Sequence, residues 1–200
     1  MKLRVVELLI ITTVPAVVLA EGGFPDLGLL AWTLVGGTLA AGSANAFNMV
    51  IESERDALMK RTAKRPIVIG AVTRTQATIF AAAVGLLSLV IFYLFTTPLA
   101  TALTAVAILY YVVIYTIALK PNTSQNIVWG GAAGCMPVLI GWAAVTNSLS
   151  WVAVAFFMVI FFWTPPHFWA LAIKYKDDYS AAGIPMLPSV ATRANVIGQM

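Results

Sequence analysis

Long apolar stretches alternate with short polar connections along the chain. Each stretch has about the 20 residues that an α-helix needs to cross the hydrocarbon core of a membrane. Because the connections are short, neighbouring helices are expected to run antiparallel in one domain, residues 1–200. Residues 189–200 begin a further segment, which stops at Met200. The pattern predicts an all-α polytopic transmembrane bundle with six complete spans, at residues 3–20, 27–51, 76–95, 98–119, 126–146 and 150–173.

The composition supports this interpretation. Of the 200 residues, 60% are hydrophobic and 10% are charged, whereas a soluble domain carries about 25% charged residues. Most of the surface is therefore expected to face the lipid bilayer. The net charge of +4 is explained by cytoplasmic loops rich in Lys and Arg, so no nucleic acid partner is expected. The single cysteine, Cys135, excludes an intrachain disulfide.

The basic residues predict the orientation of the chain in the membrane. Connections near residues 21–26, 96–97 and 147–149 carry no Lys or Arg. Since cytoplasmic loops are enriched in these residues, the N-terminus is expected in the cytoplasm of a multi-pass protein, in a bacterial plasma membrane. A cleaved signal peptide at residues 3–20 is the alternative, although Glu7 interrupts its apolar run. All 12 basic residues lie on the expected inner side: Lys2, Arg4, Arg55, Lys60, Arg61, Lys64, Arg65, Arg74, Lys120, Lys174, Lys176 and Arg193.

A dense polar group follows the second stretch. Asn48, Glu52 and Asp56 are spaced i, i+4 and i+8, so they share one face if the helix continues over them. Two carboxylates stacked in this way repel each other unless a cation binds them. Mg²⁺ is commonly held by one or two carboxylates together with substrate phosphates. The spacing therefore predicts a metal site for a phosphate-bearing substrate.

Basic residues follow this acidic group directly. Arg binds phosphate oxygens through two N–H groups, and Lys adds a compact charge. Small residues at 36–44 and 130–134 allow close helix packing around a central cavity. Acids and bases at the mouth of such a cavity suit a diphosphate attached to a lipid tail. The alternative is a solvated loop that only sets topology, which leaves Asn48 and Glu52 unexplained. The basic residues are Lys60, Arg61, Lys64 and Arg65.

A second charged group follows the sixth stretch, four spans later and therefore on the same side of the membrane. Two acidic sites facing one cavity suit two metal ions, one on each side of a diphosphate. The alternative is a loop of mixed charge without a ligand. The group consists of Lys174, Lys176, Asp177 and Asp178.

The sixth stretch also contains Pro165 and Pro166, which are expected to kink or break the helix. His167, the only histidine, follows them. It is either a metalloporphyrin contact or a group that satisfies the backbone freed by the prolines. Neighbouring aromatic residues suit stacking on a flat ring, but an interfacial aromatic belt is the favoured interpretation. They are Trp163, Phe168 and Trp169.

Two polar residues flank the connection between the fourth and fifth stretches. Lys120 either reaches a phosphate or anchors the helix end with its ammonium at the interface. Asn126 is a candidate cap for the helix that follows.

Taken in order, these motifs resemble a known family. The pattern Asn48-x3-Glu52-x3-Asp56-x2-Met59-x-Arg61-Thr62-x2-Arg65-Pro66 looks like the first acidic motif of the UbiA-type prenyltransferases. The resemblance covers nearly the whole chain. Segments similar to the protoheme IX farnesyltransferase (haem O synthase) branch are residues 59–66, 115–120, 126–134, 137–142, 163–171, 176–179 and 183–188.

The resemblance implies an intramembrane enzyme built as a helical bundle around a cavity. Its reaction would transfer a farnesyl group from farnesyl diphosphate to a vinyl group of haem B. Addition of water would give haem O, a precursor of the haem A of terminal oxidases, so haem A synthase and oxidase assembly factors are candidate partners. Mg²⁺ is the implied cofactor. Since the family continues beyond the sixth helix, the chain is expected to be incomplete at its C-terminus.

The resemblance also implies roles for individual residues. Arg61, Lys64, Arg65 and Lys120 would neutralise the leaving diphosphate, and His167 would contact haem. The implied metal ligands are Glu52, Asp56 and Asp177. The candidate catalytic residues are Asn48, Glu52, Asp56, Arg61 and Lys120. The candidate substrate-binding residues are Lys64, Arg65, Tyr115, Asn126, His167, Lys174, Asp177 and Asp178.

The chain differs from the family pattern at four positions, and these differences concern the geometry of the metal site rather than the class of reaction. The family usually has Asp at the positions of Glu52 and Glu54, Arg at Ser53 and Pro at Leu3.

Two other functions stay open. A prenyltransferase acting on an aromatic quinone precursor would share the diphosphate site but not the 163–171 stretch. A transporter would place its acids near the middle of the bilayer, whereas these acids cluster at helix ends.

Overall fold

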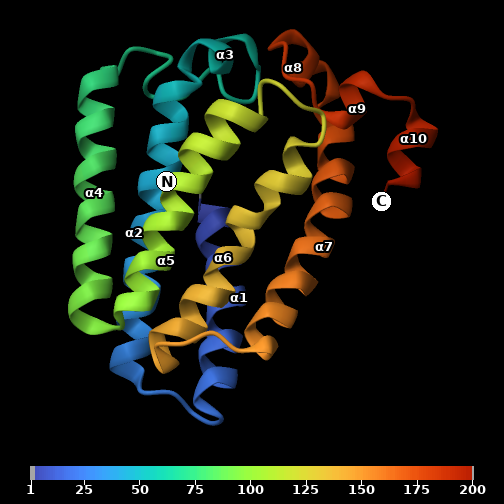
Figure 1. Cartoon of the computed structure of the whole chain (residues 1–200). Helices are drawn as coiled ribbons and strands as arrows, with labels where there is room; N and C mark the ends of the chain where they lie inside the picture. Colours follow the sequence, from blue (N-terminus) through green and yellow to red (C-terminus); the bar gives the residue numbers. More distant parts are fainter. Residues whose placement is uncertain (1–2, 200) are drawn as a thin grey trace.

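The computed structural model describes residues 3–199, and side chains from residue 11 onward. The described chain consists of helices and their connections, without a β-strand. Six helices are long, and four short ones lie in the connections or near the C-terminus (Figure 1). The long helices are α1 (Leu3–Glu21), α2 (Leu27–Ile51), α4 (Arg74–Phe95), α5 with its π-helical continuation η1 (Pro98–Leu109 and Tyr110–Leu119), α6 (Asn126–Thr146) and α7 (Trp151–Lys174). The short helices are α3 (Ser53–Leu58), α8 (Lys176–Ala181), α9 (Leu187–Val190) and α10 (Arg193–Gly198).

The six predicted helices are present, each within two residues of its expected bounds. Five of them, α2, α4, α5 with η1, α6 and α7, are long and apolar enough to cross a membrane. For α1 only the part Ile11–Glu21 has described side chains, and it is too short to span alone. Lys2, Arg4 and Glu7 lie outside the residues whose side chains are described. That α1 crosses the membrane therefore stays a prediction.

Two local expectations differ from the structure. Pro165 and Pro166 do not break α7, which runs without interruption from Trp151 to Lys174; helices in membranes tolerate proline when neighbouring groups satisfy the freed backbone. The kink that is the other expected effect of these prolines stays a prediction. The segment predicted to begin at residue 189 forms instead two short helices, α9 and α10. Thr192 separates them, because its side chain caps α10 by accepting from the N–H of Asn195.

Small residues bring the long helices together. Helix α6 packs against α1, α5 and α7, and lies between them in Figure 1. A Cβ on Gly141 would lie 3.1 Å from Thr13 of α1, so the absence of a side chain permits this approach. Helices α2 and α4 are joined by two buried hydroxyl groups: Ser43 donates to the carbonyl of Ala81, and Ser88 to that of Gly36.

Both ends of the bundle are closed by apolar clusters. At the end that carries α3 and α8 (Figure 1), Met59, Ile127, Trp169 and Val196 share one cluster, so the connection after α3 is packed against α6, α7 and α10. At the opposite end the cluster combines α4, α5 and α6 through Phe92, Ala100, Ile140, Ala143 and Ala144. The sequence thus places its two charged groups at one end of the bundle, above an apolar interior.

Candidate active site

A column of three buried polar side chains marks the end of α2. Helix α2 ends at Ile51 and α3 begins at Ser53. Backbone hydrogen bonds nevertheless continue across the junction, from the N–H of Glu52 to Asn48 and from that of Asp56 to Glu52. Asn48, Glu52 and Asp56 therefore share one face, as their spacing predicts, and each is at most 2% exposed.

Each residue of this column has a partner from another segment. The side-chain amide of Asn48 donates to the hydroxyl of Thr116 at 3.2 Å. The ammonium of Lys120 lies 2.6 Å from Oε2 of Glu52. The guanidinium of Arg65 pairs with Oδ2 of Asp56. The predicted bases Lys120 and Arg65 thus lie directly against the predicted acids.

The partners of Asn48 and Glu52 come from η1, a π-helical segment that the sequence analysis did not predict. The N–H of Lys120 donates to the carbonyl of Tyr115, five residues earlier. Such segments are rare and are frequently found at functional sites. The ring of Tyr115 lies 5.9 Å from the ammonium of Lys120 and packs on α6, where a Cβ on Gly130 would be 2.1 Å from it. The absence of a side chain at Gly130 therefore permits η1 to bring Lys120 to Glu52.

The connection after α3 turns back on itself and so returns Arg65 to Asp56. The hydroxyl of Thr62 donates to the backbone carbonyl of Asp56 at 2.8 Å, and the N–H of Arg65 donates to the carbonyl of Thr62 at 3.0 Å. Thr62 is 2% exposed. Sequence analysis noted Thr62 only as part of a motif; its place between the two charged residues identifies it as a positioning residue.

Among the residues that the structure describes, two oxygens of the column have no hydrogen-bond partner. Oε1 of Glu52 and Oδ1 of Asp56 are both buried and unpaired. A buried, unpaired carboxylate oxygen is costly, so such atoms call for an explanation. A divalent cation fits here, because it takes oxygen ligands and offsets the negative charge. Among the described residues no three Asp, Glu, His or Cys side chains come together. The protein would thus supply only part of a coordination shell, as is usual for Mg²⁺.

The second charged group meets the first through Arg61. The N–H of Arg61 donates to Oδ2 of Asp178 at 3.3 Å. Its guanidinium lies over the rings of Tyr175 and Tyr179, at 5.4 and 5.9 Å from their centroids. Asp177 is exposed and has no hydrogen bond or ion pair with another described residue. The structure therefore joins the two charged loops, as the sequence predicts, but uses Asp178 for the contact and leaves Asp177 free.

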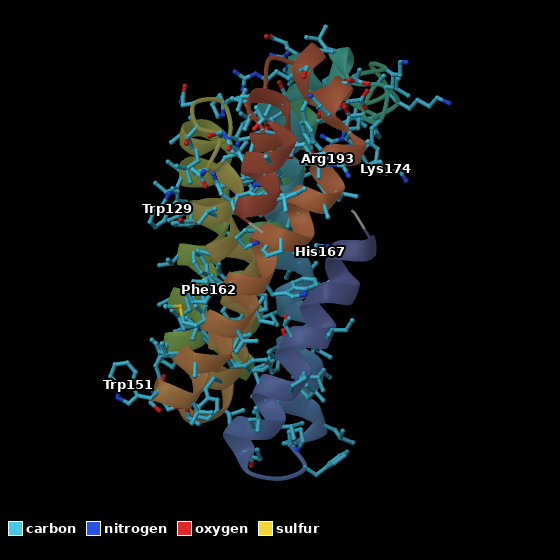
Figure 2. All side chains as sticks on the ribbon, turned by 90° about the vertical axis from the view of Figure 1, so that its right-hand side faces the viewer. Trp129, Trp151, Phe162, His167, Lys174 and Arg193 are labelled. Carbon is cyan, nitrogen blue, oxygen red and sulfur yellow. The ribbon has the colours of Figure 1, made fainter. Side chains whose placement is uncertain are left out.

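Four other candidates lie outside this column. Lys64 and Lys174 are exposed. Asn126 is fully buried, but it does not cap α6: the cap position is Gln125, and the amide of Asn126 donates to the carbonyl of Thr123. His167 is exposed on α7, away from the end that carries Lys174 (Figure 2). Its ring stacks on Trp163 at 4.3 Å, so an exposed flat surface is present there.

An apolar cavity of about 150 Å³ lies inside the bundle, below the column. Its walls come from α1, α2, α4, α5, η1 and α6. Tyr111, which lines the cavity, lies against Tyr115 with 5.2 Å between the ring centroids and an angle of 42° between the rings. Helix η1 therefore contributes both to the cavity wall, through Tyr111, and to the charged column, through Thr116. The sequence analysis did not single out Tyr111, although it lies one turn before Tyr115.

Comparisons with known proteins agree with this arrangement. The profile of the UbiA prenyltransferase family matches residues 9–199. The chain is 55% identical over 195 residues to a protoheme IX farnesyltransferase of Clavibacter michiganensis, covering 98% of this chain and 64% of the relative. It is 56% identical over 195 residues to protoheme IX farnesyltransferase 1 of Saccharopolyspora erythraea, covering 98% and 62%. The chain thus spans a little under two thirds of the length of these relatives.

Two solved structures share the fold. A UbiA homolog from Aeropyrum pernix, solved in its apo form, gives a TM-score of 0.81 at 19% identity, covering all of this chain and 74% of that one. A UbiA homolog from Archaeoglobus fulgidus, bound to DMAPP and Mg²⁺, gives 0.72 at 16% identity, covering 94% and 67%. At these identities the likeness concerns the fold.

Proposed function

The chain belongs to the UbiA prenyltransferase family, and on that premise we propose that it transfers a farnesyl group from farnesyl diphosphate to a vinyl group of haem B. The product is haem O. The observation that carries the prenyl-transfer proposal is the pair of buried, unpaired oxygens on Glu52 and Asp56, above an apolar cavity and beside two bases. The choice of haem B as acceptor is supported by the names of the relatives.

In this proposal Glu52 and Asp56 would hold Mg²⁺ through their unpaired oxygens, and Asp177 on α8 would hold a second ion on the other side of the diphosphate. The ions supply positive charge that binds the diphosphate and stabilises it as it leaves. Lys120 and Arg65 hold the same two carboxylates by their other oxygens. These contacts hold the two carboxylates in a fixed orientation.

The reaction needs a stabilised leaving group more than a strong base. The bond between C1 of the farnesyl group and diphosphate oxygen breaks, and its electron pair leaves with the diphosphate. The terminal vinyl carbon bonds to C1, and water adds to the other vinyl carbon with loss of a proton. Preorganised cations at the leaving group are usually the largest catalytic contribution in such a step. The candidates are Arg61, Lys64, Arg65 and Lys120.

The acceptor would approach from the side of α7. His167 and Trp163 form an exposed stacked pair on that helix, which suits contact with a flat porphyrin. Lys174, near the end of α7, is then placed at the membrane surface, where a propionate of haem would lie. The N-terminus is proposed to face the cytoplasm, with both charged loops on that side.

Two alternatives use the same fold. A quinone-precursor prenyltransferase would share the column and the cavity and differ only in the acceptor. A transporter requires polar residues along a path through the membrane, whereas the cavity is lined mainly by Gly, Ala and apolar residues. The column lies at a helix end, which favours capture of a diphosphate.

The test uses the full-length protein in lipid with farnesyl diphosphate, haem B and Mg²⁺, followed by mass spectrometry of the extracted haem. The proposal expects a mass gain of one farnesyl group plus one hydroxyl group, lost without Mg²⁺ and in Asp56→Asn. Glu54→Gln is the matched control, because Glu54 is exposed and pairs only with the surface residue Arg74. Prenylation of a quinone precursor but not of haem would refute haem B as the acceptor. No prenyl transfer to either acceptor would refute the proposed prenyltransferase activity.

A further inference from the structure

The side chain of Arg61 lies over two aromatic rings. Arg61 belongs to the connection between α3 and α4, and its guanidinium is 5.4 Å from the ring centroid of Tyr175 and 5.9 Å from that of Tyr179. The two tyrosines are four residues apart at the start of α8, and the N–H of Tyr179 donates to the carbonyl of Tyr175. One helical turn therefore presents both rings to the same cation.

The donors of this guanidinium are not used by any other described residue. Arg61 takes part in none of the ion pairs of the described chain. Asp178 accepts from the backbone N–H of Arg61 at 3.3 Å and not from its guanidinium. The N–H groups of an Arg lie in the plane of the guanidinium, so a contact with the face of a ring leaves them free for an anion. The five donors are thus held in place by contacts that use none of them.

Arg61 also lies beside the acidic column. Thr62, the next residue, donates its hydroxyl to the backbone carbonyl of Asp56 at 2.8 Å. The phenol of Tyr115 is within electrostatic range of both Glu52 and Arg61. A diphosphate bound at the column would therefore have next to it a guanidinium with free donors.

We propose that Tyr175 and Tyr179 are positioning residues that hold the guanidinium of Arg61 for the diphosphate of the prenyl donor. This inference rests on the proposed prenyl transfer and adds two residues of the second charged loop to it. A freely moving Arg side chain loses rotamer freedom when it binds a ligand, whereas one already held by two rings loses less. Removal of a ring should therefore weaken binding of a diphosphate that the ring does not touch.

The experiment measures binding of pyrophosphate with Mg²⁺ to the full-length protein in detergent, together with the KM for farnesyl diphosphate. Tyr179 is the residue to replace, because Arg61 is the only cation over its ring among the described residues, whereas Tyr175 also has the ammonium of Lys174 at 5.9 Å. Tyr179→Leu should weaken binding about threefold, as expected for one exposed cation–π contact. Tyr179→Phe keeps the ring and should bind pyrophosphate as the wild type does. Tyr93→Leu is the matched control, since Tyr93 is exposed on α4 and lies under no cation of the described chain.

A double-mutant cycle with Arg61→Met shows whether the ring acts through Arg61. Arg61→Met alone should weaken pyrophosphate binding about tenfold or more, because charge-assisted hydrogen bonds are lost. In that background Tyr179→Leu should change binding less than about twofold, since the cation that the ring holds is absent. The KM for haem B should stay the same in Tyr179→Leu, whereas a general loss of structure would raise the KM of both substrates.

The outcomes separate this inference from the reaction itself. An equal effect of Tyr179→Leu with and without Arg61, or no effect in either background, would overturn the positioning role. Tyr179 packs against the cluster that contains Met59; should Tyr179→Leu not fold, Tyr175→Leu and Tyr175→Phe test the same role by pyrophosphate binding. A wild type that binds no pyrophosphate overturns the inference. A wild type in which the expected pyrophosphate results hold but no prenyl group is transferred refutes the proposed function alone.

Discussion

The ammonium of Lys120 lies 2.6 Å from Oε2 of Glu52 and joins the end of η1 to the end of α2. The two side chains are 12% and 2% exposed. Oε1 of the same carboxylate has no hydrogen-bond partner in the described part of the chain. Lys120 thus satisfies one oxygen of Glu52 and leaves the other free for a ligand, so the ion pair both stabilises and orients the site.

Replacing Lys120 with Met should therefore cost stability as well as activity. Removing one partner of a buried ion pair leaves an uncompensated charge and typically costs about 3–5 kcal/mol. We expect Lys120→Met to lower the thermal stability of the detergent-solubilised protein without Mg²⁺ and to abolish turnover, while Lys120→Arg keeps most of the stability.

The control for this prediction is Arg74→Met. It breaks the ion pair with Glu54, whose side chains are 57% and 84% exposed, and exposed pairs are worth about 0–1 kcal/mol. Equal stability losses in Lys120→Met and Arg74→Met would contradict the buried pairing seen here.

Gly130→Ala should displace η1. The added Cβ would lie 2.1 Å from the ring of Tyr115, so the ring or the helix must move, and Lys120 moves with it. We expect lower thermal stability and a large loss of turnover. Gly134→Ala, one turn later in α6, meets nothing within 4 Å and should be neutral or stabilising by about 0.5–1 kcal/mol, because Ala favours the helix. Similar stability in the two variants would show that the contact with Tyr115 is unimportant.

The helices and the acidic column could be predicted from the sequence because their signals are local. Apolar stretches of membrane length define the long helices, and the i, i+4, i+8 spacing of Asn48, Glu52 and Asp56 places them on one face whether or not the helix is interrupted at residue 52. The stretch of small residues on α2 likewise indicated a cavity. Each of these predictions rests on a pattern within one segment of the chain.

The pairings between segments could not be predicted in the same way. Whether Lys120 meets Glu52 depends on the hydrogen bonds between residues five apart in η1, which the apolar sequence of that helix does not reveal. The diphosphate role of Arg61 stays a prediction, but the position of its guanidinium over Tyr175 and Tyr179, more than a hundred residues later, was not predicted. Long-range contacts of this kind depend on how the helices pack.

Asp177 and Asp178 should differ in the property that each controls. Asp177 is exposed and unpaired among the described residues, so it is free to bind metal, and Asp177→Asn should raise the Mg²⁺ concentration needed for half-maximal turnover. Asp178 accepts from the backbone of Arg61, so Asp178→Asn should loosen the contact between the loops and speed proteolysis of residues 60–65. Mg²⁺ titrations and limited proteolysis on both variants decide this; a changed Mg²⁺ requirement in Asp178→Asn alone would reverse the assignment.

The orientation of the chain can be tested with single cysteines, because the native Cys135 is buried and should not react. Lys64 and Ser148 are both exposed but lie in connections at opposite ends of the bundle. If the basic loops face the cytoplasm, Ser148→Cys should react with a membrane-impermeant maleimide on intact cells, and Lys64→Cys only after permeabilisation.

A protease-sensitive tag at the N-terminus then decides whether α1 crosses the membrane. Six spans place the tag on the same side as Lys64, whereas five place it on the side of Ser148, since α1 would then not carry the chain across.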